Sequence, residues 1–134
     1  MENINNKPLS SFGAILQNGA YAELLKPAEM KEWASNDMPE ADGTEYLAPT
    51  TPRVKERDVN LTFLIEGKDT SAFLTAYKGF MAEITKGFCS LHVPDLGRTF
   101  TLKYESCTSF DFFNKRACKI AVKFTEPIPQ NYAL

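Results

Sequence analysis

The chain has 134 residues, a formal net charge of −2, and 43% hydrophobic, 24% charged and 12% aromatic residues. This length and composition are typical of one globular domain, and they exclude a disordered, collagen-like or disulfide-rich protein. A general nucleic-acid-binding protein carries an excess of basic residues, which this chain lacks.

The chain start indicates no export or membrane insertion. Residues 1–6 are polar and lack the basic and apolar regions of a signal peptide, and no apolar stretch approaches the ~20 residues that span a bilayer. We therefore expect synthesis in a reducing cytoplasm and no membrane partner. The cysteines Cys89, Cys107 and Cys118 form no C-x-x-C motif and are interpreted as small buried side chains.

The first residues give weak structural signals. Residues 1–10 are polar and predict a flexible arm before one domain at 11–134. Asn18-Gly19 favours a type I′ turn, which predicts a hairpin between Phe12–Gln17 and Ala20–Leu25.

A long irregular segment is expected next. Pro27–Ala34 is rich in helix formers and predicts a short helix that begins at proline. Ser35–Glu56 holds three prolines and Asp42-Gly43, so it predicts an ordered loop that lies over a surface or reaches a partner. Residues 11–56 are thus expected to form a hairpin and an extended loop.

Residues 57–127 carry the clearest periodic signals. Arg57–Glu66 alternates apolar and polar residues, as a half-buried strand does. Ser71–Lys86 has apolar residues three and four apart, which predicts an amphipathic helix that stops at Gly87. Further strands are predicted at Phe88–Val93, Arg98–Glu105, Cys107–Phe113 and Arg116–Thr125.

The resulting β-α-β-β-β-β core predicts an α+β fold. We expect a mainly antiparallel β-sandwich or split barrel with one flanking amphipathic helix and a long irregular loop. The aromatic residues of its strands and helix are interpreted mostly as core: Phe63, Phe73, Tyr77, Phe80, Phe100, Tyr104, Phe110, Phe112, Phe113 and Phe124.

The sequence contains no recognisable chemistry. Its one histidine, His92, has no evident catalytic partners, and the glycines form no phosphate-binding loop. Asp37, Glu40 and Asp42 lack the spacing of a calcium loop. We therefore predict no catalytic residue, no metal site and no cofactor.

Charge is divided between the two halves of the chain. Residues 1–66 carry a net charge of −5 and residues 67–134 a net charge of +3. One interpretation is a solvated sheet face; the other is that the acidic loop of one subunit binds the basic sheet of the next, which gives a ring or a filament. Trp33 and Tyr46 either cover the core locally or anchor such a contact. The candidate interface residues are Trp33, Asp37, Glu40, Asp42, Glu45, Tyr46, Arg98, Lys119 and Lys123.

A family pattern extends from Asp42 to Pro127. It comprises Asp42-Gly43-x-x-Tyr46, the alternating strand that ends in Phe63-Leu64-Ile65-Glu66-Gly67, the helix with Tyr77, Phe100-Thr101-Leu102-Lys103-Tyr104, and Phe124-Thr125-Glu126-Pro127. This pattern resembles the N-terminal domain of the distal tail proteins of long-tailed bacteriophages and, more loosely, the tail-tube proteins. The chain departs from that family in having no large C-terminal extension, so receptor binding is not expected of it.

The resemblance implies a structural protein and not an enzyme. It implies a self-assembling, hexameric ring in the virion tail, formed in the bacterial cytoplasm, with other tail proteins as partners and no recognition of nucleic-acid sequence. Two alternatives remain at this point. One is a domain that binds a small ligand in an apolar pocket between sheet and helix; the other is a small enzyme that works through cysteine or carboxylates.

Overall fold

The structure, a computed structural model, describes residues 2–31, 34–36, 45–47 and 55–128. Between the strands lie two short 3-10 turns, Leu9–Phe12 and Pro94–Leu96, and the helices α1 (Ala20–Leu25) and α2 (Thr70–Thr85). The strands are β1 (Asn3–Ile4), β2 (Lys7–Pro8), β3 (Ala14–Leu16), β4 (Ala34–Asn36), β5 (Glu45–Leu47), β6 (Arg57–Glu66), β7 (Phe88–Val93), β8 (Arg98–Phe113) and β9 (Ala117–Glu126).

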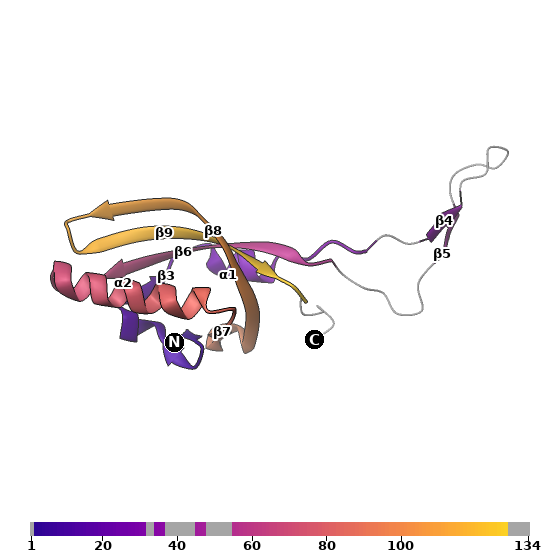
Figure 1. The fold of residues 1–134 in the computed structure, drawn as a ribbon. Helices are drawn as coiled ribbons and strands as arrows, with labels where there is room; N and C mark the ends of the chain where they lie inside the picture. The colour runs from indigo at the N-terminus through magenta and orange to yellow at the C-terminus, as the bar shows by residue number, and fades with distance from the viewer. Residues whose placement is uncertain (1, 32–33, 37–44, 48–54, 129–134) are drawn as a thin grey trace.

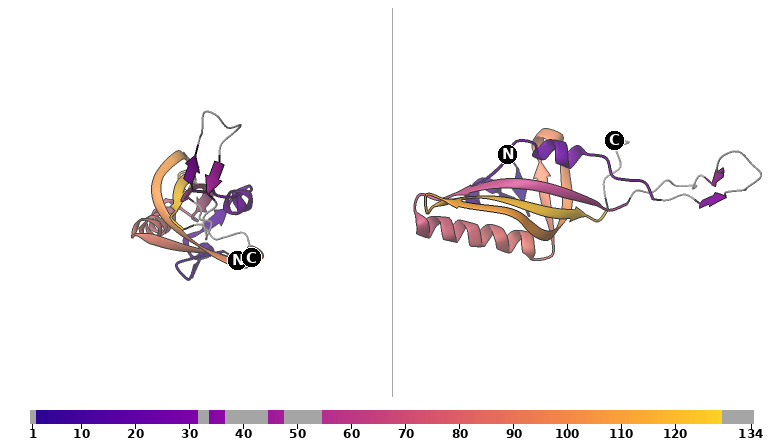
Figure 2. Two further views of the ribbon diagram at one scale, coloured as in Figure 1. Left: turned by 90° about the vertical axis from the view of Figure 1, so that its right-hand side faces the viewer. Right: turned by 90° about the horizontal axis from the view of Figure 1, so that it is seen from above.

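Seven of the described strands form one antiparallel sheet in the order β2-β1-β7-β8-β9-β6-β3. The sheet curls, and α2 lies along one of its faces in contact with β6, β7 and β8 (Figures 1 and 2). This half-barrel with one main helix confirms the predicted α+β fold of antiparallel sheet and flanking helix.

The core lies between α2 and the inner face of the sheet. Alternate residues of β6 are fully buried, as the period-two pattern predicts: Val59, Leu61, Phe63 and Ile65. Phe80 of α2 packs edge-on against Phe63, with ring centroids 4.9 Å apart. Burial of aromatic and aliphatic side chains on both elements is what holds the helix to the sheet.

Helix α2 begins with a side-chain cap at Asp69. The Asp69 side chain accepts a hydrogen bond from the Ala72 N–H at 2.7 Å, which satisfies one of the free donors of the first turn. The turn from β6 into α2 is tight, because a Cβ on Gly67 would lie 2.4 Å from the backbone nitrogen of Phe73. Only glycine fits at that position without a shift of the backbone.

The prediction of a flexible arm at residues 1–10 is wrong. β1 pairs with β7, with Ile4 opposite Leu91, and both Ile4 and Leu9 are buried in the core. Two isolated apolar residues in a polar segment produce no periodicity, so their burial is decided by tertiary packing alone.

The hairpin predicted around Asn18-Gly19 is also wrong. β3 pairs with β6, and residues 20–25 form helix α1, in which the buried residues Ala20 and Leu24 lie four apart. Gly19, at φ 90°, precedes the helix instead of forming a hairpin turn. The described residues 27–31 are not helical, because Lys26 before Pro27 is extended and ends α1.

Two of the predicted strands form one. β8 runs from Arg98 to Phe113 without a break, and register shifts occur between Tyr104 and Ser106 and between Cys107 and Ser109. Each β-bulge adds a residue that interrupts the alternation, so the sequence indicates a strand boundary where the structure has a bend.

The predicted irregular loop contains a pair of short strands. β4 and β5, which we call the arm, pair antiparallel, with Ser35 opposite Tyr46. They form a separate sheet that lies well beyond one end of the main sheet (Figure 1). This position fits the expectation of a segment that reaches away from the body better than that of one laid over its surface.

Candidate assembly surfaces

The acidic half of the predicted contact belongs to the arm and its neighbours in the sequence. Trp33, Asp37, Glu40 and Asp42 lie outside the described residues, so their predicted roles stay predictions. Glu45 and Tyr46 are residues of β5 and pair with Asn36 and Ser35 of β4.

The basic half of the predicted contact is split. Lys119 and Lys123 lie on β9 between buried residues and point away from the core, as their alternation predicts. Arg98 begins β8, where it pairs with Val93, and the residue of β8 opposite Lys119 is Asp111, near the other end of the strand. The structure therefore groups the two lysines on one face and separates Arg98 from them.

The outer face of the sheet is mixed in charge and not uniformly basic. Lys123 Nζ lies 3.6 Å from Asp58 Oδ2 on β6, and Lys103 Nζ lies 3.4 Å from Glu105 Oε1. Such exposed pairs contribute little stability, but they do offset the positive charge that the sequence assigns to this face. Lys119 has no ion pair among the described side chains and is exposed.

A basic cluster that the sequence analysis did not single out lies at the β8–β9 turn. The Gly67 N–H donates to the Arg116 carbonyl at 2.9 Å, which brings the end of β6 against this turn. The cluster, which we call the basic tip, consists of the exposed residues Lys68, Lys115, Arg116 and Lys119. The exposed carboxylates Glu66, Asp69 and Asp111 lie at the same end, so its excess of positive charge is small. The turn lies at the end of the molecule opposite β4 and β5 (Figure 1), so the arm and the basic tip of one chain are far apart.

Part of β8 has an unpaired edge. Along β8, the strand β7 pairs with Arg98–Lys103 only, whereas β9 pairs with residues 103–113. Among the described strands, nothing pairs with the outer edge of β8 from Tyr104 to Phe113. β3 is the opposite edge of the same β8-β9-β6-β3 region, so this region presents two free edges on opposite sides.

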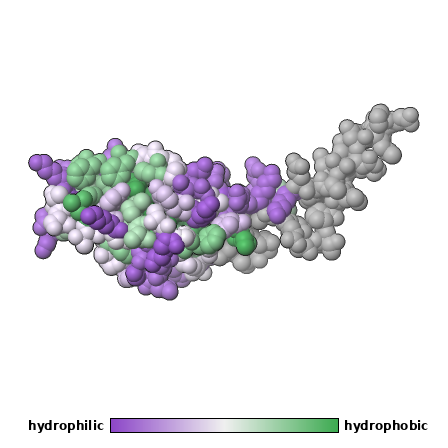
Figure 3. Space-filling model, viewed as in Figure 1, coloured by the Kyte–Doolittle hydropathy of each residue, from purple (hydrophilic) through white to green (hydrophobic). Residues whose placement is uncertain are grey.

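Aromatic side chains lie beside the free edge of β8. Phe110, Phe112 and Phe113, predicted as core, are exposed, and Phe112 retains 51% of its accessible surface. Phe112 packs against Phe73 and Phe110 against Tyr77, with centroids 5.4 and 5.8 Å apart. Figure 3 shows the apolar surface above α2 at the end away from the arm. Contiguous exposed apolar surface of this kind is typical of an interaction site.

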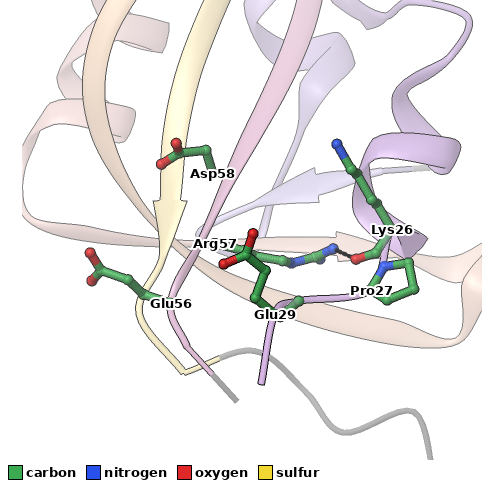
Figure 4. A pocket seen from close by; sticks show the side chains of 7 residues that line it. Lys26, Pro27, Glu29, Glu56, Arg57 and Asp58 are labelled. Carbon is green, nitrogen blue, oxygen red and sulfur yellow. Dashed lines mark hydrogen bonds between the residues drawn. The ribbon is translucent and has the colours of Figure 1, made fainter. Parts of the chain in front are cut away.

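The alternative of an apolar ligand pocket between sheet and helix has no support. Fully buried side chains of β6 and α2 fill that space. A surface groove of about 320 Å³ lies instead beside the start of β6, and its lining includes the charged residues Lys26, Glu29, Glu56, Arg57 and Asp58 (Figure 4).

Among the described residues, the cysteines and the histidine are not grouped with one another or with an acid and a base in a catalytic arrangement. Burial raises the pKa of both the Cys89 and Cys118 thiols to about 11, which disfavours the nucleophilic thiolate. Cys107 is exposed, contrary to the prediction, and its thiol donates to the Ser109 carbonyl. His92 Nδ1 lies 2.9 Å from Thr99 Oγ1. Within the described residues, no helix has the length and apolarity that a membrane crossing requires.

The fold has a counterpart among solved structures. The Dit protein of phage SPP1 (gp 19.1), described as a paradigm of the hub adsorption apparatus in phages that infect Gram-positive bacteria, matches with a TM-score of 0.65 and 13% sequence identity. The match covers 96% of this chain and 49% of the Dit chain, so the present chain spans about half the length of that protein. No protein-family model and no curated protein sequence matches the chain. The likeness therefore lies in the fold, which agrees with the resemblance stated from the sequence pattern.

Proposed function

We propose that this chain is a structural component of a bacteriophage or prophage tail that assembles with copies of itself into a ring at the tail tube or tail tip. The observation that carries the proposal is the fold shared with the SPP1 Dit protein across almost the whole chain. Because that protein is described as a phage hub, a structural place in the virion tail is the function that this fold favours most.

The free edges of the sheet support assembly by head-to-tail contact. Unpaired backbone groups of β8 residues 104–113 face one side, and β3 faces the other. When the β8 edge of one copy pairs with the β3 edge of the next, each copy still has one edge left to continue the assembly. Such a heterologous contact closes into a ring when the rotation between copies allows it. The exposed Phe110 and Phe112 would lose water at the same contact.

Charge gives a second contact of the same kind. Residues 32–54 hold five acidic residues and one basic residue, whereas the basic tip lies at the far end of the body. Within this stretch the described strands β4 and β5 lie at the end opposite the basic tip (Figure 1), so an attraction between the acidic stretch around them and the basic tip is expected to act between chains. Complementary charge of this sort guides encounter and selects partners more than it adds affinity.

The remaining partners follow from the same role. A ring component of a tail contacts the ring or tube on either side of it, so other tail proteins are the expected partners. The assembled protein belongs to the virion tail and is made in the bacterial cytoplasm.

Light scattering behind size exclusion tests the proposal directly. We expect a discrete species with about six times the 15.0 kDa mass of the chain, a ring number that rests on the family resemblance. Added salt should weaken the species, because exposed charges are screened over about 10 Å at 0.1 M salt. Electron microscopy of the same fraction should reveal rings with an open centre.

A strict monomer at the highest protein concentration, at both low and high salt, would contradict self-assembly. An open-ended series of masses would instead indicate a filament, in which the same contact fails to close. Because an unassembled tail protein can require a template, the monomeric sample is then mixed with purified tail tubes. Failure to bind their ends would overturn the tail role as well.

A further inference from the structure

The end of α1 has no cap of the usual kind. The helix ends at Leu25, and Lys26 follows with φ −59° and ψ 130° before Pro27. No left-handed glycine or asparagine is present to satisfy the last carbonyl groups, which therefore need donors from elsewhere.

Arg57 supplies those donors from the first position of β6. Its Nη1 donates to the Glu23 carbonyl at 3.3 Å and to the Lys26 carbonyl, and its Nη2 donates to the Leu24 carbonyl. Figure 4 shows the guanidinium pointing at the Lys26 carbonyl. A cation at the carbonyl end of a helix also interacts favourably with the helix dipole.

The same guanidinium binds the end of β9. Arg57 Nε lies 2.6 Å from Glu126 Oε1, and the two side chains are only 9% and 1% exposed. A buried ion pair is often no more stabilising than apolar residues of the same size, because both charges lose their hydration. Stability alone therefore does not explain why a charged pair lies here. The planar guanidinium group does offer an explanation, because it holds several hydrogen-bond donors in fixed directions.

These contacts involve the last described segment of the body before β4, residues 23–29, and the first described residues after β5, residues 55–57. The chain runs from α1 through Glu29 toward β4, and it returns from β5 through Lys55 to Arg57. The Lys55 N–H donates to the Glu29 carbonyl at 2.7 Å, and Lys55 Nζ lies 3.7 Å from Glu29 Oε2. The Arg57 side chain thus links the end of α1 and the start of β6 to Glu126, the last residue of β9.

We propose that Arg57, held by Glu126, is a positioning residue that fixes the direction of the β4–β5 arm relative to the sheet. The four donated hydrogen bonds come from one planar group, so the end of α1 cannot turn relative to β6 and β9 without breaking several of them. The use of the arm as a contact with a second copy rests on the proposed function, but its fixed direction is a property of one chain.

Pulsed electron-electron resonance between two spin labels measures that direction. The labels are attached at Glu45→Cys in β5 and Asn60→Cys, an exposed position in β6, in a Cys107→Ser background that leaves only buried native thiols. An excess of unlabelled chain ensures that only distances within one chain are recorded. We expect one narrow distance distribution in the reference protein.

Two variants remove the hydrogen bonds that Arg57 donates to the end of α1 and to Glu126. Arg57→Leu with Glu126→Leu removes both buried charges together, so no unpaired charge remains to prevent folding. Arg57→Lys keeps the positive charge but loses the planar guanidinium group with its several fixed donors. Both should broaden the distribution by about twofold, because the carbonyls at the end of α1 lose their donors. Hydrogen exchange should then rise in residues 23–29 while β6 and β9 remain protected.

The matched control is Asp58→Leu with Lys123→Leu, which removes the exposed ion pair between the same two strands. Its distribution should stay narrow. A broad distribution in the reference protein, or an unchanged one in both Arg57 variants, would overturn the inference. These outcomes are independent of ring formation, so a monomeric protein with a narrow distribution would contradict the proposed function and support the role of Arg57.

Discussion

Glu83 joins the N-terminal strands to α2. Its largely buried carboxylate accepts hydrogen bonds from Asn5 Nδ2 at 2.8 Å, Lys7 Nζ at 2.5 Å and Lys86 Nζ at 3.0 Å. The hydrogen bond from Lys7, then those from Asn5 and Lys86, lower the pKa of this carboxyl from 4.5 to about 2. The folded chain therefore stabilises the charged form of Glu83.

Acid should remove this stabilisation. Because the pKa of Glu83 in the folded chain is lowered, its contribution is fully present above about pH 4.5 and is lost as the pH falls toward 2. Glu83→Gln should reduce the free energy of unfolding by about 1–2 kcal/mol at neutral pH, since three donors lose a charged acceptor. Urea unfolding of both proteins, near pH 7 and near pH 2, should show the difference shrink in acid.

Glu66→Gln serves as the control, because this carboxylate is exposed at the end of β6. It should change stability little at either pH. A Glu83→Gln variant with the same deficit at both pH values would contradict the role of the charge. Faster amide exchange in Asn3–Ile4 of that variant would locate the loss at β1.

The two free edges of the sheet predict which variants assemble with each other. Phe112→Lys places a charge beside the free edge of β8, and Ile15→Lys places one on β3, where Ile15 is 61% exposed. Charged side chains on an edge strand oppose pairing with another strand. Each variant alone should therefore fall from the ring mass to the monomer mass in light scattering.

A mixture of the two variants should behave differently from either one. The Phe112→Lys chain keeps its β3 edge and the Ile15→Lys chain keeps its β8 edge, so one intact pair of edges remains between them. An equimolar mixture should give a dimer and nothing larger, which is the expected signature of a heterologous contact. Rings in either variant alone, or a mixture that remains monomeric, would refute edge pairing.

Phe88→Lys is the matched control for these edge variants. Phe88 is 63% exposed on β7, opposite Lys103 and outside the free length of β8. It should assemble like the unchanged protein, so any loss in Phe112→Lys is not a general effect of replacing an exposed phenylalanine by lysine.

The sequence predicts well those elements in which buried apolar side chains recur at a regular spacing over many residues. β6, α2 and β9 each bury one face over ten residues or more, so apolar side chains recur every second or every third to fourth position. α1 has six residues and one buried pair, Ala20 and Leu24, which is too short a repeat to outweigh the turn signal of Asn18-Gly19. β1 has two residues and no repeat at all.

The assembly surfaces depend on pairing that no local pattern contains. The outward direction of Lys119 and Lys123 follows from alternation, but the partnership of Lys123 with Asp58 depends on the register of β6 with β9. Phe110 and Phe112 lie opposite buried β9 residues and yet are exposed, on the part of β8 that β7 does not pair with. Arg57 begins a predicted strand, and nothing nearby in sequence points to its partners in α1.

The two ends of the described molecule differ, because β4 and β5 lie at one end and the β8–β9 turn lies at the other (Figure 1). The arm, in an acidic part of the sequence, projects from one end of the body, and the basic tip occupies the other (Figure 1). A fixed arm direction, as inferred for Arg57, would present the acidic segment at a constant angle to the next chain. The reduced freedom of a preoriented segment lowers the entropic cost of binding.

Charge reversal on β9 tests whether this attraction contributes to assembly. Lys119→Glu with Lys123→Glu reverses the two outward-pointing positive charges of β9, one of which belongs to the basic tip, and so opposes contact with an acidic segment of a neighbouring chain. We expect the protein concentration at half-assembly to rise by about tenfold at low salt, which corresponds to about 1.4 kcal/mol. The difference from the unchanged protein should shrink as salt is added, because salt screens both the attraction and the repulsion.

Lys78→Glu provides the comparison, since Lys78 is an exposed lysine of α2 and changes the net charge without altering the sheet face. It should assemble almost as the unchanged protein does. Unchanged assembly of the double variant at low salt would reject the charged contact and leave edge pairing as the basis of any ring. A loss about half as large in Lys78→Glu, which reverses one lysine where the double variant reverses two, would instead assign the effect to net charge, because repulsion between whole chains does not depend on which lysine is reversed.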